Sequence, residues 1–415
     1  MQPILIEKPY RFIPPHRGDW WPTLIRDWDL PGWWLRRKEG VVSHEIRGAD
    51  YLRESLRAKH GILLAPNHCR LADPMVMSWL ARDVRCLVYA MASWHLFQQS
   101  RFMGWAIPRM GGFSVYREGV DRQAINLAIE VLETAARPLV IFPEGAVSRT
   151  NDRLHALLDG VAFIARTAAK RRAKAVTGGQ IVVHPVAIKY LFRGDFDAAA
   201  DPVLTEIEQR LSWQPQKHLS TDQRIAKIGL TLLGLKEMEY FGRTYADALA
   251  DRMTRLIDRL LCPLEEEWFG SAASGPVVPR VKALRMKIMP DMVRTELEPA
   301  ERQRRWRQLA DIYLAQQISN YPPEYLQHLS VDRLLETIER FEEDLTDRVR
   351  VHGSLHAVIE VGAGIPVSAQ RDRQAEVDPL MVEIEQRLQQ MLDRLAHESP
   401  LYTPSARSGA SEAGV

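Results

Sequence analysis

The chain has 415 residues, enough for one large domain or two ordinary ones, and its 46% hydrophobic and 26% charged residues exclude extensive disorder. Lys and Arg number 55 against 53 Asp and Glu, and this balance does not suggest a nucleic-acid binder. The three cysteines, Cys69, Cys86 and Cys262, are scattered along the chain. They predict a reduced cytoplasmic protein with no metal site, and we expect no cofactor.

The N-terminal segment is rich in aromatic residues. Arg and Lys side chains lie among five tryptophans: Trp20, Trp21, Trp28, Trp33 and Trp34. This composition is typical of a segment at a lipid headgroup layer, and equally of an aromatic arm packed on the main domain. No apolar run reaches the ~18 residues of a membrane-spanning helix, and no signal peptide is visible. We therefore expect a cytoplasmic protein lying peripherally on the inner face of the membrane.

Apolar runs of strand length alternate with helical patterns in the following segment. The predicted strands are 61–66, 84–90, 112–116, 138–142 and 181–188. Apolar residues recur at helical spacing in 121–136 and 153–170. The alternation predicts an α/β fold in which helices flank a mostly parallel sheet.

The alternation of strands and helices ends near residue 198, and the following segment has helical periodicity with little strand signal. Strand character returns at 354–361, and an amphipathic helix follows, which predicts a largely helical insertion in the α/β fold. The insertion is open to two interpretations, a lid or an oligomer interface. The predicted division is a Trp-rich arm, an α/β core, the helical insertion, a terminal strand and helix that rejoin the core, and a disordered tail: 1–49, 50–197, 198–350, 351–398 and 399–415.

A histidine and an aspartate mark the end of the first strand of that core. His68 and Asp73 lie where the run 61–66 gives way to a helical pattern, and such loops commonly carry the chemistry of α/β folds. An imidazole held by a carboxylate is the usual general base near neutral pH. The alternative is that Asp73, followed by a proline, only caps the helix.

Three further blocks follow in order. They are Gly111–Arg117, Ile141–Gly145 with the sequence Ile-Phe-Pro-Glu-Gly, and the proline-containing strand Val183–Ile188. With the His-x-x-x-x-Asp block they resemble the glycerolipid acyltransferases of the lysophosphatidic acid acyltransferase type, over roughly residues 50–190. The matching positions are Asn67, His68, Asp73, Gly112, Phe113, Arg117, Phe142, Pro143, Glu144, Gly145 and Pro185.

The resemblance implies transfer of a fatty acyl group, from acyl-CoA or acyl carrier protein, to the hydroxyl of a lysophospholipid or glycerol phosphate at the membrane surface. His68 would be the general base and Asp73 would orient its imidazole. The resemblance also implies that Arg117 binds an acceptor phosphate, since a guanidinium suits phosphate. The expected substrate-binding residues are Asn67, Arg117, Glu144, Gly145 and Arg149.

The third block departs from the family pattern. The family often continues Glu-Gly-Thr-Arg-Ser, whereas Ala146 and Val147 stand here and Arg149 lies two residues late. The departure leaves open an amine or a non-phosphorylated acceptor, and a non-catalytic binding protein on the same fold is a further alternative. Cys69 is interpreted as structural, because adjacent side chains such as His68 and Cys69 do not easily pair as base and nucleophile.

Overall fold

The computed structural model describes residues 8–175, 179–294, 297–321, 324–327, 329–348, 350–371, 374–375 and 377–404. The strands are β1 (Val41–Arg47), β2 (Gly61–Pro66), β3 (Tyr89–Ser93), β4 (Gly112–Val115), β5 (Leu139–Val140), β6 (Ile181–Arg193), β7 (Ser354–Val361) and β8 (Ile365–Pro366). The helices before β6 are α1 (Trp20–Asp27), α2 (Leu30–Lys38), α3 (Ala49–Arg57), α4 (Asp73–Asp83), α5 (Trp94–Gln98), α6 (Arg101–Arg109), α7 (Arg122–Thr134) and α8 (Gly160–Arg172). The helices after it are α9 (Phe196–Arg210), α10 (Thr221–Phe241), α11 (Leu249–Phe269), α12 (Val277–Arg294), α13 (Pro299–Ser319), the 3₁₀ turn η1 (Tyr325–Gln327), α14 (Val331–Thr346) and α15 (Pro379–Ala396).

The eight strands of the described residues form one sheet, in the order β1-β7-β6-β2-β5-β3-β4 with β8 beside β6. Only the β6–β7 and β6–β8 pairs are antiparallel. The predicted α/β fold with a mostly parallel sheet is therefore confirmed, and β7 joins the sheet between β1 and β6. Because β2, β3, β4 and β5 are parallel, the loops that follow them meet at one edge of the sheet.

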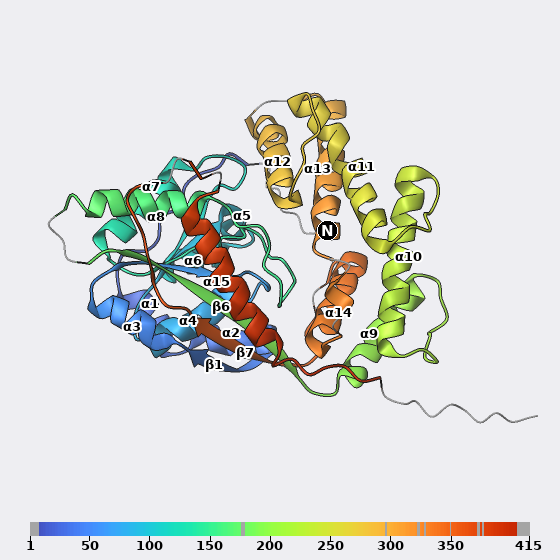
Figure 1. The fold of residues 1–415 in the computed structure, drawn as a ribbon, viewed down its shortest axis with the longest axis horizontal. Coiled ribbons are helices and arrows are strands. Elements are labelled where there is room, and N and C mark those ends of the chain that lie inside the picture. Colours follow the sequence, from blue (N-terminus) through green and yellow to red (C-terminus); the bar gives the residue numbers. More distant parts are fainter. Residues whose placement is uncertain are drawn as a thin grey trace, which may run out of the picture.

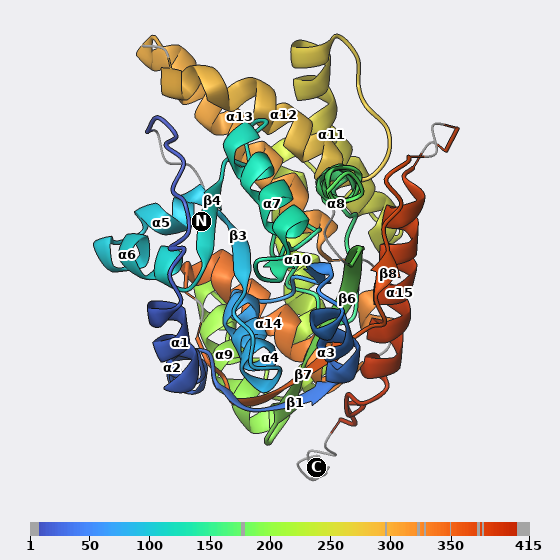
Figure 2. The same ribbon diagram turned by 90° about the vertical axis from the view of Figure 1, so that its left-hand side faces the viewer.

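Both faces of the sheet are covered by helices. Along β2, Ile62 and Leu64 belong to one hydrophobic core, and Leu63 and Ala65 belong to the other, as the two-residue period of a strand requires. The first core includes residues of α4, α9 and α14, and the second includes residues of α7, α8 and α15. Figures 1 and 2 show α15 lying alongside β6.

Among the strands that differ from the sequence expectations, β1 and β3 differ most. β1 was not predicted, because it lies at the sheet edge with mostly exposed side chains and so lacks an apolar pattern. β3 covers 89–93 rather than 84–90, since α4 continues to Asp83 and Arg85 takes a left-handed conformation with φ of 54°. The apolar residues of 84–90 therefore lie mostly in the connection before β3.

The helical segment between β6 and β7 is divided between two hydrophobic cores. Helices α9 and α14 pack into the same core as β6 and β7. Helices α11, α12 and α13, with the C-terminal part of α10, build a separate core. In Figure 1 these helices stand beside the α/β body. The segment 198–350 therefore contributes to two cores, and its boundaries as an insertion stay a prediction.

Some aromatic rings of the N-terminal arm pack on the α/β body, and others are exposed to solvent. Trp21 lies edge-on to Trp105 of α6, with 5.2 Å between ring centroids. Trp20, Trp28 and Trp33 are instead 63%, 72% and 56% exposed. None of the helices in the described residues combines the length and apolar character that a membrane-spanning helix needs.

Candidate active site

His68 and Asp73 meet at the sheet edge where β2 ends. The loop from Asn67 to Ala72 turns back on itself, so that His68 Nδ1 lies 2.8 Å from Asp73 Oδ2. Asp73 is fully buried, and the His68 side chain keeps 15% of its surface exposed. Because Nδ1 faces the carboxylate, Nε2 remains to act on a substrate, which is the arrangement that a general base needs.

The Asp73 carboxylate is bound by three other donors. The buried Tyr190 hydroxyl on β6 donates to Oδ1 at 2.6 Å, the Arg70 backbone N–H donates to Oδ2 at 2.9 Å, and the Cys69 thiol lies 3.8 Å from Oδ1. The Phe142 ring stacks on the imidazole, with 4.2 Å between ring centroids. The donors fix the carboxylate, and the carboxylate together with Phe142 fixes the orientation of the His68 ring.

Glu144 holds the His68 loop through the backbone. Its Oε1 accepts the His68 N–H at 2.6 Å, and its Oε2 accepts the His155 N–H at 3.1 Å. Burial raises the Glu144 pKa to about 8, although both N–H groups favour its ionised form. The Ser148 N–H donates to the His68 carbonyl at 2.8 Å, so both backbone polar groups of His68 are bound. The predicted role of Glu144 in acceptor binding stays a prediction, since both oxygens bind backbone amides.

Gly145 and Asn67 shape the same loops. Gly145 has a φ of 69°, and a Cβ there would lie 2.5 Å from Leu158 Cδ1, so a side chain would be strained and crowded. The Asn67 side chain accepts the Ile188 N–H at 2.7 Å and donates to the Ile188 carbonyl at 3.0 Å. Asn67 thereby ties the end of β2 to β6. Contact of either residue with substrate stays a prediction.

The two predicted arginines differ in their surroundings. Arg149, with φ of 59°, forms an ion pair with Glu343 of α14 at 2.9 Å. Arg117 follows β4 at the same sheet edge as His68. Burial and the neighbouring Arg285 lower the Arg117 pKa to about 10, and Glu118 only partly offsets this. An anion would relieve the charge of this partly buried guanidinium, and the binding of a phosphate by Arg117 stays a prediction.

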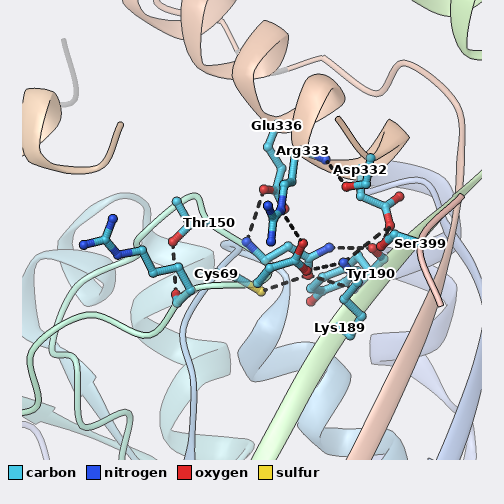
Figure 3. A network of polar contacts seen from close by, with 12 residues as sticks. Cys69, Thr150, Lys189, Tyr190, Asp332, Arg333, Glu336 and Ser399 are labelled. Atoms are coloured by element: carbon cyan, nitrogen blue, oxygen red, sulfur yellow. Dashed lines mark hydrogen bonds and ion pairs between the residues drawn. The ribbon is translucent and has the colours of Figure 1, made fainter. Parts of the chain in front are cut away.

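A buried polar network joins the site to α14 (Figure 3). Lys189 on β6 is fully buried and forms ion pairs with Asp152 and Asp332, and Asp152 also accepts from Arg333 at 2.8 Å. The Asn151 backbone N–H donates to Glu336 at 3.1 Å. The Cys69 thiol lies 3.8 Å from the Asn151 side-chain oxygen, and burial raises its pKa well above the usual value, which supports its structural interpretation.

The sequence analysis missed most of this supporting network. Tyr190 and Lys189 are polar residues in a strand that is otherwise apolar and buried, and this was the available signal. Ser148, Asp332 and Glu336 carry no local signal, because each acts on a partner far away in the chain.

Comparisons with known proteins point to the same chemistry. Residues 45–189 match the family model described as Acyltransferase. A 1-acyl-sn-glycerol-3-phosphate acyltransferase from Streptococcus pneumoniae (strain ATCC BAA-255 / R6) is 34% identical over 110 residues. That match covers 26% of this chain and 38% of the relative. Each match covers only part of the chain. The segment that matches the family model contains His68, Asp73, Arg117 and Glu144. Residues 45–189 therefore match an acyltransferase domain, and the comparisons support a relationship of this segment to the glycerolipid acyltransferases.

Proposed function

We propose that the protein transfers a fatty acyl group from acyl-CoA or acyl carrier protein to the hydroxyl of a lysophospholipid or glycerol phosphate. The observation that carries the proposal is the pair His68–Asp73, with 2.8 Å between Nδ1 and Oδ2, in a region that matches the acyltransferase family. A protein used only for binding has no need of an imidazole held by a buried carboxylate.

The proposed reaction needs a base because an alcohol is a poor nucleophile near neutral pH. His68 Nε2 takes the proton of the acceptor hydroxyl as its oxygen attacks the thioester carbonyl, and Asp73 stabilises the imidazolium that forms. The new ester C–O bond forms and the C–S bond breaks. The imidazolium returns the proton to the leaving thiolate, so that ester and thiol are the products. The acceptor is itself the nucleophile, and no acyl-enzyme is required.

The surroundings of the pair suit this role. Tyr190 and the Arg70 N–H hold Asp73, and Glu144 and Ser148 hold the His68 backbone, so the base is fixed before substrate arrives. Such preorganisation lowers the cost of reaching the transition state. In this proposal Glu144 and Asn67 position the loop, and Arg117 binds the acceptor phosphate.

Reaction at a membrane surface is part of the proposal. The exposed rings belong to Trp20 on α1, Trp33 on α2 and Trp28 between the two helices, and the Arg37 guanidinium lies 6.0 Å from the Trp33 ring centroid. Exposed tryptophans beside cations suit a lipid headgroup layer. A peripheral position would bring a lysolipid acceptor close to His68 without a spanning helix.

The experiment that tests the function is thiol release from a long-chain acyl-CoA by the purified protein. The acceptor panel pairs lysophosphatidate with monoacylglycerol, and glycerol 3-phosphate with glycerol, and includes a long-chain amine. We expect release that depends on a phosphorylated hydroxyl acceptor. Release with the amine or with monoacylglycerol alone would contradict the proposed acceptor class. If acyl-CoA gives no release with any acceptor, the same panel with acyl carrier protein as donor decides whether the protein is a transferase.

A further inference from the structure

Helix α12 reaches from the helical bundle to the loop that carries Arg117. Arg285 of α12 forms an ion pair with Glu118, with 2.7 Å between Nη2 and Oε1, and both side chains are largely buried. In Figure 1, α12 is the helix of the bundle that faces the α/β body near α5. The contact places a cation of α12 beside the residue that follows Arg117.

A second cation of α12 adds to the positive charge at this place. Lys282 precedes Arg285 by three residues, which puts both side chains on one face of the helix. The Lys282 side chain is exposed. Partial desolvation, then the charge of Arg117, lowers its pKa, while Asp159 acts in the opposite direction. Burial, then the charges of Arg117 and Arg285, lowers the pKa of His95 of α5 to about 4. Arg117, Lys282 and Arg285 therefore bring positive charge to the end of β4, where Glu118 binds Arg285.

The two carboxylates that follow Arg117 most closely in the chain, Glu118 and Asp121, bind partners other than Arg117. Glu118 binds Arg285. Asp121 accepts from Tyr10, from the Tyr116 N–H at 3.0 Å and from the first turn of α7. Within the part of the chain that the structure describes, no hydrogen bond or ion pair joins Arg117 or Lys282 to a carboxylate. A partly buried guanidinium without a carboxylate partner favours an anion from outside the chain.

We propose that Lys282 and Arg285 of α12 complete, together with Arg117, a binding site for a phosphate group of a substrate. The inference rests on the proposed acyl transfer and deepens it, since it gives the helical bundle a part in substrate recognition. It also supplies two cations in a chain whose third block carries Ala146 and Val147 instead of the Thr and Arg that the family often has there. Arg285 is oriented by Glu118, and phosphate would bind on the side that Glu118 leaves open.

The test measures binding rather than turnover. We would titrate the full-length protein with short-chain lysophosphatidate, with monoacylglycerol of the same chain length, and with coenzyme A. The variants are Lys282→Ala, Arg285→Ala and the double variant. Lys287→Ala is the matched control, because Lys287 lies on the same helix and its Nζ lies 5.9 Å from the Phe269 ring centroid. Thermal unfolding checks each variant, and Lys282→Ala removes no hydrogen bond between described residues.

The expected result is a loss of at least about tenfold in lysophosphatidate affinity in the double variant, with monoacylglycerol affinity and the Lys287→Ala control unchanged. A loss confined to coenzyme A would also support the phosphate site and would assign it to the donor. Equal losses for lysophosphatidate and monoacylglycerol, or unchanged affinity for both phosphate-bearing probes, would overturn the inference. So would a wild-type protein that binds neither. Because this experiment measures binding and not turnover, its result does not depend on whether the protein shows acyl transfer.

Discussion

Arg70 forms an ion pair with Glu339 of α14, with 2.7 Å between Nη2 and Oε2. Arg70 lies two residues after His68, and its guanidinium also lies 5.4 Å from the Tyr190 ring centroid. The loop that carries the proposed base is therefore supported by a helix more than two hundred residues later in the chain. Helix α14 acts as part of the site's scaffold and not only as part of an insertion.

Replacing Lys189 with methionine is expected to destabilise the protein. The change leaves the buried carboxylates of Asp152 and Asp332 without their shared cation, and an uncompensated buried charge costs about 3–5 kcal/mol. Urea unfolding measures the difference. The matched control is Lys217→Met, because Lys217 is 59% exposed in its ion pair with Asp201, and such pairs contribute about 0–1 kcal/mol. Equal effects of the two substitutions would contradict the role of the buried network.

Stability is expected to fall as pH rises from about 5 to about 8. Burial, then the neighbouring Asp152, raises the Glu336 pKa from 4.5 to about 8. Between these values the folded state keeps a proton that the unfolded state releases. This contribution to stability is therefore complete at a pH below the Glu336 pKa of the unfolded state, and it is lost as pH rises through the Glu336 pKa of the folded state. In Glu336→Gln the loss of stability should be smaller by up to a few kcal/mol.

The check is a series of urea unfolding curves across that pH range. Glu385→Gln is the control, because Glu385 is exposed on α15 and should leave the slope unchanged. A Glu336→Gln variant with the wild-type slope would show that Glu336 does not hold a proton in the folded state.

Tyr190→Phe is expected to lower kcat by about tenfold with little change in KM, since it removes one hydrogen bond to a charged group. Without the tyrosine hydroxyl, the Asp73 carboxylate loses a bond that fixes its orientation, and the imidazole is less well placed for proton transfer. Tyr402→Phe is the control, because the Tyr402 hydroxyl binds Asp197 at 3.0 Å, outside the site. An unchanged kcat in Tyr190→Phe would mean that the hydroxyl does not support the base.

The exposed tryptophans are expected to govern vesicle binding. Trp28→Ser with Trp33→Ser should weaken binding to vesicles that contain anionic phospholipid by roughly tenfold or more, because two large rings no longer enter the interface. Sedimentation with vesicles measures the effect. Phe163→Ser is the control, since Phe163 is 59% exposed but lies on α8. If both changes weaken binding equally, the arm is not the docking surface.

The sequence predicted those features that depend on neighbours in the chain. Buried strands such as 61–66 show as apolar runs, and the loops that carry His68 and Glu144 follow directly from them. The turn at Gly145 is likewise a local matter of backbone conformation. The family resemblance added Arg117, whose chemistry no spacing rule gives.

The remaining features depend on contacts between distant segments. Arg285 and Glu118 lie 167 residues apart, and nothing near either residue indicates the pairing. The role of α14 was missed for the same reason, because its partners Arg70, Arg149 and Lys189 come from other parts of the chain. β1 was missed because an exposed edge strand carries no apolar pattern.

The most direct measurement compares wild-type protein with His68→Ala for acceptor-dependent thiol release from acyl-CoA, or from acyl carrier protein if that is the donor. Cys69→Ala serves as the matched control, because Cys69 is the adjacent residue and its buried thiol makes only a long contact of 3.8 Å with Asp73 Oδ1, the oxygen that does not face His68. The proposal predicts a rate lower by about 10²–10⁴-fold in His68→Ala, with unchanged thermal unfolding and near-normal activity in Cys69→Ala. A folded His68→Ala variant that keeps the wild-type rate would contradict it.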